Sequence, residues 1–247
     1  MKEVLKKVLI GLLLLLSIFQ YAYTQGISVK TYIPPQATEL YSLVIQETDK
    51  YMPSFTTPFY FSALMEHESC IHLKHSKCLR PTSTLSTARE YGVGLGQITK
   101  AYRKDGTIRF DTLTSLRRQF PKDLGELSWD NVKDRPDLQI RAIVLLYREG
   151  CRTLHTVKDD YERMAMCDSV YNGGLRDLQS ARRICGLTKD CDPQFWFNHT
   201  ERYCQKSKKI LYGDRSACDI NTYHVEDVLK NRLPKYRKDY TRYYLID

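Results

Sequence analysis

All eight cysteines of this 247-residue chain follow a short apolar segment near the N-terminus, at positions 70, 78, 151, 167, 185, 191, 204 and 218. An even number of cysteines after such a segment is typical of an exported protein whose thiols are oxidised to disulfides. Eight cysteines allow roughly 100 pairings, so the sequence leaves the connectivity open. Short separations favour two local pairs, Cys70 with Cys78 and Cys185 with Cys191.

The apolar segment itself predicts a secretory signal over residues 1–24. Three lysines precede the apolar run from Val8 to Phe19, and small or polar residues follow it up to Thr24. The run is shorter than the roughly 20 residues that span a bilayer comfortably. An uncleaved N-terminal anchor is the alternative, and it would be the one expected contact of the chain with a membrane.

The composition of the remaining chain fits a globular protein with a positive surface. Hydrophobic residues make up 42% of the sequence and charged residues 27%, so the body of the chain is expected to fold. Removing residues 1–24 takes away three lysines and one glutamate and lowers the formal net charge from +9 to +7. A positive surface suits an anionic polymer such as bacterial cell wall. Nucleic acid as a partner would fit the charge as well, but export argues against that partner. A need for solubility alone would also explain the positive charge.

The spacing of apolar residues indicates a predominantly α-helical protein. We expect a polar linker over 25–35, a main domain over 36–185, and a basic, aromatic and mostly helical extension over 186–247 that packs on the main domain. A structured loop or small hairpin is expected over 76–96, because this stretch combines a proline, many Ser/Thr residues and three glycines. Helices are predicted over 36–52, 58–69, 109–120, 136–150 and 159–172.

Glu68 is an acid on the apolar face of the predicted helix over 58–69. It follows Leu64 by four residues and Met65 by three, and therefore shares their face. Glu66 lies about 200° away on the helical wheel and is expected to face solvent. Burial disfavours a charged carboxylate and favours the protonated form that a general acid needs near neutral pH.

Two other roles for this end of the helix remain open. Glu68 could form a buried structural ion pair with an arginine such as Arg89 or Arg141. The run from His67 to His72 also approaches the zinc-protease pattern, but that pattern needs two histidines four residues apart and these are five apart. A Cys70–Cys78 disulfide would also leave these two thiols unable to bind a metal, so we expect no metal and no other cofactor.

Two further segments combine glycines with polar side chains. In Gly92-Val-Gly-Leu-Gly-Gln97 the alternating glycines would let the backbone approach a ligand, with the Gln97 amide beside it. This spacing differs from that of a phosphate-binding loop. In Ser169-Val-Tyr-Asn-Gly-Gly174 a tyrosine and an asparagine stand at a predicted helix end, where they could orient a carboxyl or a sugar acetamide, or could only cap the helix.

In this order and spacing, three segments resemble those of the lysozyme-like soluble lytic transglycosylases, including phage-type endolysins: Glu68-Ser69, Gly92 to Gln97 and Tyr171 to Gly174. That family shows a helix ending in Glu-Ser, then Gly-x-Gly-Leu-x-Gln, then Ala-Tyr-Asn-x-Gly. Goose-type lysozyme is a more distant likeness. The resemblance covers roughly residues 58–185. The chain departs from the family at Gly96, where a Met is frequent, and in a long segment between Ile98 and Pro136 that looks like an insertion.

The resemblance implies a two-lobed, lysozyme-like helical domain with a small loop or β-hairpin beside an active-site cleft. It implies cleavage of the β-1,4 bond between N-acetylmuramic acid and N-acetylglucosamine in peptidoglycan strands by a monomer, periplasmic or secreted, of bacterial or phage origin. Glu68 would protonate the leaving oxygen and then deprotonate the 6-hydroxyl of the sugar, which gives a 1,6-anhydro product. The residues that the resemblance places against the substrate are Ser69, Gly94, Leu95, Gln97, Tyr171 and Asn172.

Two alternatives to this activity remain open. A peptidoglycan hydrolase of the lysozyme or muramidase type would need a second acid, for which Glu90 and Asp105 are the nearest candidates in the sequence. A non-catalytic cell-wall-binding protein on the same fold would still bind glycan after Glu68→Gln. The mass of the products separates the first two activities, because hydrolysis adds a water and leaves a reducing end.

Overall fold

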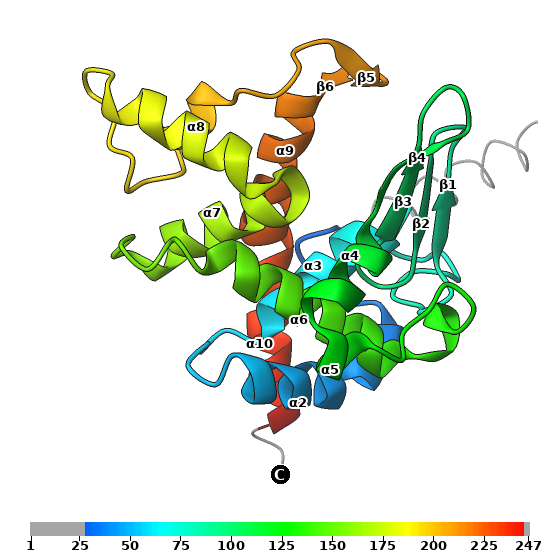
Figure 1. Ribbon diagram of the computed structural model, residues 1–247. Helices are drawn as coiled ribbons and strands as arrows, with labels where there is room; N and C mark the ends of the chain where they lie inside the picture. Colours follow the sequence, from blue (N-terminus) through cyan, green and yellow to red (C-terminus); the bar gives the residue numbers. More distant parts are fainter. Residues whose placement is uncertain (1–27, 245–247) are drawn as a thin grey trace, which may run out of the picture.

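The computed structural model describes residues 28–244, so the predicted signal over 1–24 lies outside the described residues. Figure 1 shows a mainly helical molecule with a small sheet at one side, which confirms the predominantly α class. The helical elements are η1 (Pro35–Leu40), α2 (Tyr41–Tyr51), α3 (Phe59–Ser69), α4 (Thr112–Gln119), α5 (Pro121–Leu124), η2 (Val132–Asp134), α6 (Pro136–Cys151), α7 (Asp160–Gly173), α8 (Leu175–Gly186), η3 (Thr200–Tyr203), α9 (Ala217–Glu226), η4 (Asp227–Arg232) and α10 (Leu233–Tyr244). The strands are β1 (Thr84–Ser86), β2 (Glu90–Val93), β3 (Ile98–Tyr102), β4 (Ile108–Asp111), β5 (Ile210–Tyr212) and β6 (Arg215–Ser216).

Local side-chain chemistry explains where several helices begin. Pro136 occupies the first position of α6, where its missing N–H costs nothing. The Asp159 carboxylate accepts bonds from the first backbone N–H groups of α7, and Ser216 with Asp219 forms a capping box at α9. The predicted helices over 136–150 and 159–172 are therefore confirmed. The helix predicted over 36–52 is divided into η1 and α2.

The four-stranded sheet is larger than the sequence indicated. Its order is β1-β2-β3-β4, all antiparallel. The predicted hairpin over 76–96 includes β1 and β2, but β3 and β4 were missed, and the helix predicted from 109 begins only at Thr112. Strand β4 has only four residues, so its alternation is too short to be recognised, and pairing with β3 decides its conformation. Val93 pairs with Ile98, which makes the Gly94 to Gln97 segment the turn between β2 and β3.

Two hydrophobic cores flank helix α6. The larger core joins α2, α3, α6 and α7 through side chains such as Phe61 and Tyr147, which are fully buried. The smaller core lies where Val93 and Ile98 of the sheet meet α4, α5 and the opposite face of α6. Since α6 supplies residues to both cores, it fixes the position of the sheet, and of the turn after β2, relative to α3.

Helices α9 and α10, with the π-helical turn η4 between them, pack against α3 and α7. Val225, Leu229 and Tyr236 belong to the same buried cluster as Phe61 of α3. Figure 1 shows α9 to α10 as one long column beside α3 and α7. Residues 217–244 therefore contribute to the larger core.

The eight cysteines form four disulfides, Cys70–Cys78, Cys151–Cys167, Cys185–Cys191 and Cys204–Cys218. The two local pairs predicted from the sequence are confirmed. Disulfides form and persist in oxidising compartments, so the protein belongs in such an environment. Within residues 28–244, none of the helices combines the length and the apolar character that crossing a bilayer requires.

Candidate active site

Glu68 lies in the last turn of α3 and is half-buried, with 17% of its side chain exposed. Its Oε1 atom is 2.9 Å from Nε2 of His224 on α9. Among the described residues, the other carboxylate oxygen has no hydrogen-bond partner. The carboxyl group is thus held through one oxygen, and the second oxygen is available for another molecule.

A chain of buried polar groups continues behind Glu68. Nδ1 of His224 is 2.7 Å from Oδ2 of Asp168 on α7, and the Tyr60 hydroxyl donates to Oδ1 of the same aspartate at 2.6 Å. Asp168 is fully buried, and His224 is 2% exposed. Three helices, α3, α7 and α9, therefore position a continuous series from Tyr60 through Asp168 and His224 to Glu68.

The two carboxylates determine the charge of His224. Burial alone would lower the pKa of His224, but Asp168 and Glu68 outweigh it and raise this pKa to about 10. The imidazole is then protonated at neutral pH and donates through both nitrogens. The His67 ring lies 4.3 Å from the His224 ring, and burial together with that positive charge lowers the pKa of His67. Of these two adjacent histidines, His224 carries the charge.

Glu68 does not form an ion pair with Arg141, the pairing that the sequence left open. Arg141 forms a bidentate ion pair with Glu47, and Glu68 contacts His224 of α9. No cluster of metal-ligating side chains occurs within residues 28–244, and Cys70 is in a disulfide.

Tyr171 connects the glycine-containing turn with Glu68. Its hydroxyl donates to the Gly96 carbonyl oxygen at 3.1 Å, and its ring stacks on His224 with 6.5 Å between the centroids. Burial raises the pKa of Tyr171 well above its usual value, and the nearby Glu68 charge adds to this effect. The three segments behind the family resemblance therefore meet around Glu68, Tyr171 and the turn after β2.

The glycines of that turn are needed for packing inside the protein. A Cβ atom on Gly94, whose φ is +81°, would lie 2.2 Å from the Gln139 amide oxygen. A Cβ atom on Gly96 would lie 2.5 Å from Ile143 and 2.6 Å from the Tyr171 hydroxyl oxygen. Close approach by the protein's own side chains thus accounts for both glycines, without a ligand.

The Gly96→Ala variant should lose about 1–3 kcal/mol of unfolding free energy, because the added methyl overpacks a buried contact and displaces Tyr171. Urea unfolding with the disulfides intact measures this loss. Gly186→Ala is the matched control, since its Cβ would make only ordinary contacts with Pro193. Equal stability of the two variants would contradict the packing role of Gly96.

The remaining residues predicted to bind substrate are engaged within the protein. Ser69 is buried; its hydroxyl donates to the Met65 carbonyl and accepts from the Leu79 N–H. Leu95 is fully buried. Gln97 is half-buried and donates to the Gly94 carbonyl oxygen at 3.0 Å.

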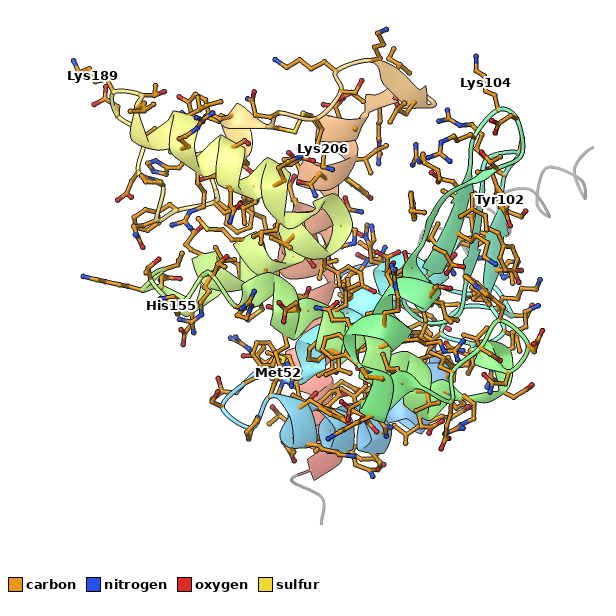
Figure 2. The ribbon with its side chains drawn as sticks, in the orientation of Figure 1. Met52, Tyr102, Lys104, His155, Lys189 and Lys206 are labelled. Atoms are coloured by element: carbon orange, nitrogen blue, oxygen red, sulfur yellow. A yellow bond between two sulfur atoms is a disulfide. The ribbon has the colours of Figure 1, made fainter. Side chains whose placement is uncertain are left out.

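The Tyr-Asn-Gly-Gly segment ends α7, with Gly174 at a φ of +90° as the cap. Asn172 is exposed, and its side-chain oxygen accepts from the Asn221 amide of α9 at 3.1 Å. Lys206 donates to the Gly173 carbonyl oxygen at 2.7 Å; Figure 2 labels it near the start of α9. The C-terminal segment therefore holds this corner in place.

The expectation that Glu66 faces solvent was wrong. Glu66 is fully buried and bonds to Arg232, Lys235 and Tyr236 at 2.5, 2.6 and 2.7 Å. The reason is that η4 and α10 cover the face of α3 opposite its contacts with the main domain. A helical wheel cannot reveal a second layer that comes from residues more than 160 positions away in the sequence.

Sequence reasoning also missed Asp168 and His224. Asp168 lies between apolar residues on α7, four after Met164 and three before Tyr171, so the wheel argument used for Glu68 would have singled it out. Its partner on α9 could not be found in this way, because the contact joins residues 56 positions apart.

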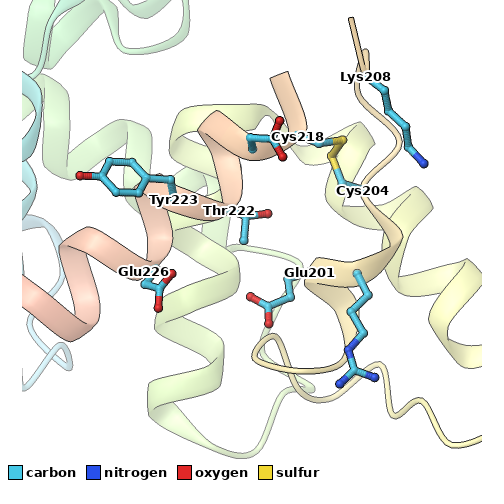
Figure 3. Close-up of a pocket in the computed structure, with 9 residues that line it drawn as sticks. Glu201, Cys204, Lys208, Cys218, Thr222, Tyr223 and Glu226 are labelled. Atoms are coloured by element: carbon cyan, nitrogen blue, oxygen red, sulfur yellow. A yellow bond between two sulfur atoms is a disulfide. The ribbon is translucent and has the colours of Figure 1, made fainter. Parts of the chain in front are cut away.

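A pocket of about 390 Å³ lies between α9 and η3. Figure 3 shows Thr222, Tyr223 and Glu226 along α9, with Glu201 and Cys204 on the facing segment. Its lining contains both bases and acids: Arg202 and Lys208, with Glu201, Asp219 and Glu226. The Tyr223 ring is 6.0 Å from that of His67, and neither Glu68 nor His224 lines the pocket.

Comparison with protein-family models and with curated proteins yields no match to this chain.

Proposed function

We propose that this protein is an exported lytic transglycosylase that cleaves peptidoglycan between N-acetylmuramic acid and N-acetylglucosamine, with Glu68 as the acid and base. The observation that supports this most is the half-buried Glu68 carboxyl, held through one oxygen by His224 beside Tyr171. An acid held in one orientation, with its other oxygen unbonded, can deliver a proton to a glycosidic oxygen.

The proposed reaction has two proton transfers. Glu68 gives its proton to the leaving oxygen as the bond to the muramic acid C1 breaks and its electron pair stays on that oxygen. The acetamide of the same sugar assists at C1. The Glu68 carboxylate then takes the proton of the sugar's 6-hydroxyl as that oxygen bonds to C1, which leaves a 1,6-anhydro end and restores the acid.

Residues around Glu68 would bind the sugar. Asn172 is exposed at the end of α7 and can reach an acetamide while Asn221 holds it from behind. Export, a cell-wall substrate and disulfide formation are mutually consistent.

Hydrolysis in place of transglycosylation would need a second carboxylate close to the reacting sugar. The two candidates from the sequence are engaged within the sheet. Glu90 forms a 3.5 Å ion pair with Arg109, and Asp105 accepts bonds from Thr107 in the turn between β3 and β4. This favours the mechanism that uses one carboxyl group.

Mass analysis of products from purified peptidoglycan tests the proposal. We expect muropeptides that are one water lighter than their hydrolysed counterparts and lack a reducing end. Products that all carry reducing ends would replace this mechanism with hydrolysis. Binding of the glycan without any release would identify a non-catalytic cell-wall-binding protein.

A further inference from the structure

We propose that His224, oriented by Asp168, is a positioning residue that holds a positive charge against Glu68 throughout the reaction. This inference rests on the proposed function of Glu68. Its role would be to fix the orientation of the carboxyl group and to stabilise the carboxylate that forms when Glu68 releases its proton.

The geometry leaves the His224 ring little freedom. Both ring nitrogens are within 2.9 Å of a carboxylate oxygen, one on α3 and one on α7. Tyr171 stacks on the ring, and His67 contacts it from α3. A ring held in this way can bind only one Glu68 oxygen, so the other oxygen keeps a defined direction toward a substrate.

The charges around His224 favour the protonated ring. Glu68 and His67 contact it from α3, and Asp168 and Tyr171 contact it from α7. Asp227, which follows α9, binds His67 and Arg232, so its negative charge is already balanced. The Asp168 charge opposes the cost of burying one cation, and Glu68 adds a second negative charge once it has released its proton. Together they raise the pKa of His224 to about 10.

The charge would act at the first proton transfer. When the Glu68 O–H bond breaks and the proton moves to the leaving oxygen, a negative charge appears 2.9 Å from the imidazolium. Their attraction is strong in a buried site and needs no rearrangement. The Glu68 carboxylate that forms is already oriented for the second transfer.

Kinetics of His224→Gln on purified peptidoglycan, measured with the full chain, test this role. Glutamine can still donate one hydrogen bond to Glu68 but carries no charge. We expect kcat to fall by roughly 10- to 100-fold with a smaller change in KM. The loss should appear in kcat and not in KM, because the charge acts on the carboxylate that forms and not on glycan binding. An unchanged kcat, or a loss confined to KM, would overturn the proposal.

His155→Gln is the matched control, since His155 is exposed in the loop after α6, as Figure 2 shows. It should keep the wild-type kcat and KM.

Nuclear magnetic resonance titration of the His224 ring separates this inference from the proposed function. In the wild type the ring should stay protonated to about pH 10, and in Glu68→Gln it should lose its proton at a lower pH. Titration of the wild-type ring near its ordinary value of about 6.5 would refute the ion pair without any substrate. Failure of the wild type to cleave peptidoglycan would refute the proposed function. Cleavage by His224→Gln with the kcat of the wild type would refute only the positioning role.

Discussion

Glu68→Gln is expected to lower the rate of peptidoglycan cleavage by at least about 10²-fold, and by up to about 10⁴-fold, because general acid and base catalysis contributes that much. The amide has nearly the same shape as the acid, but it cannot pass a proton to the leaving oxygen or take one from the 6-hydroxyl. Release of soluble muropeptides per unit time measures the loss. The folded state should persist, because the amide oxygen can still accept the bond from His224.

Binding and a second variant make this test specific. Glu68→Gln should still sediment with insoluble peptidoglycan, since only proton transfer is removed. Asp105→Asn is the control, because Asp105 is exposed in the turn between β3 and β4, and only a hydrolase would need it. It should cleave at the wild-type rate. A strongly reduced rate for Asp105→Asn would support hydrolysis, and an unchanged rate for Glu68→Gln would remove Glu68 from the chemistry.

Glu66→Gln is expected to destabilise the protein by about 3–5 kcal/mol, because removing one member of a buried ionic network leaves its partners uncompensated. Glu66 has no exposed surface and accepts bonds from Arg232, Lys235 and Tyr236. Burial lowers the pKa of Lys235, and the Glu66 charge opposes that effect. With a neutral amide at position 66, the positive charges of Arg232 and Lys235 would lose their shared negative partner.

Urea unfolding of the disulfide-bonded protein measures this effect. Glu39→Gln is the matched control, because Glu39 pairs with Arg80 at the surface, where both side chains are more than a third exposed. An exposed pair of this kind contributes about 0–1 kcal/mol, so the control should unfold nearly as the wild type does. A loss below about 1 kcal/mol for Glu66→Gln would show that the buried network does not stabilise the contact between α3 and α10.

Glu68 and Glu66 show what the spacing of apolar residues along a helix can and cannot predict about burial. The wheel placed Glu68 correctly on the face of Leu64 and Met65, and Glu68 is half-buried there. The same helical wheel predicted that Glu66 faces solvent, but Glu66 is fully buried. The spacing of apolar residues identifies the helix face that neighbouring elements cover. A face with charged residues can be equally buried when they form ion pairs, and the spacing of apolar residues does not reveal such a face.

The sequence by itself determined the predominantly helical class, the beginnings of α6 and α7, and the two disulfides with the shortest loops. These features depend on apolar spacing, on proline and capping residues, and on cysteines a few positions apart, all of which act within a short stretch of chain. The family resemblance in the sequence also predicted Glu68, Gly94 and Tyr171 as members of one candidate site.

Only the tertiary structure decided what surrounds Glu68. The contacts of Glu68 with His224 and of His224 with Asp168 join residues 156 and 56 positions apart, and strands β3 and β4 exist because they pair with each other. Contacts over such separations depend on how whole helices and strands pack together, and no local pattern encodes that packing. The charge of the candidate acid's environment is therefore a property of the assembled fold.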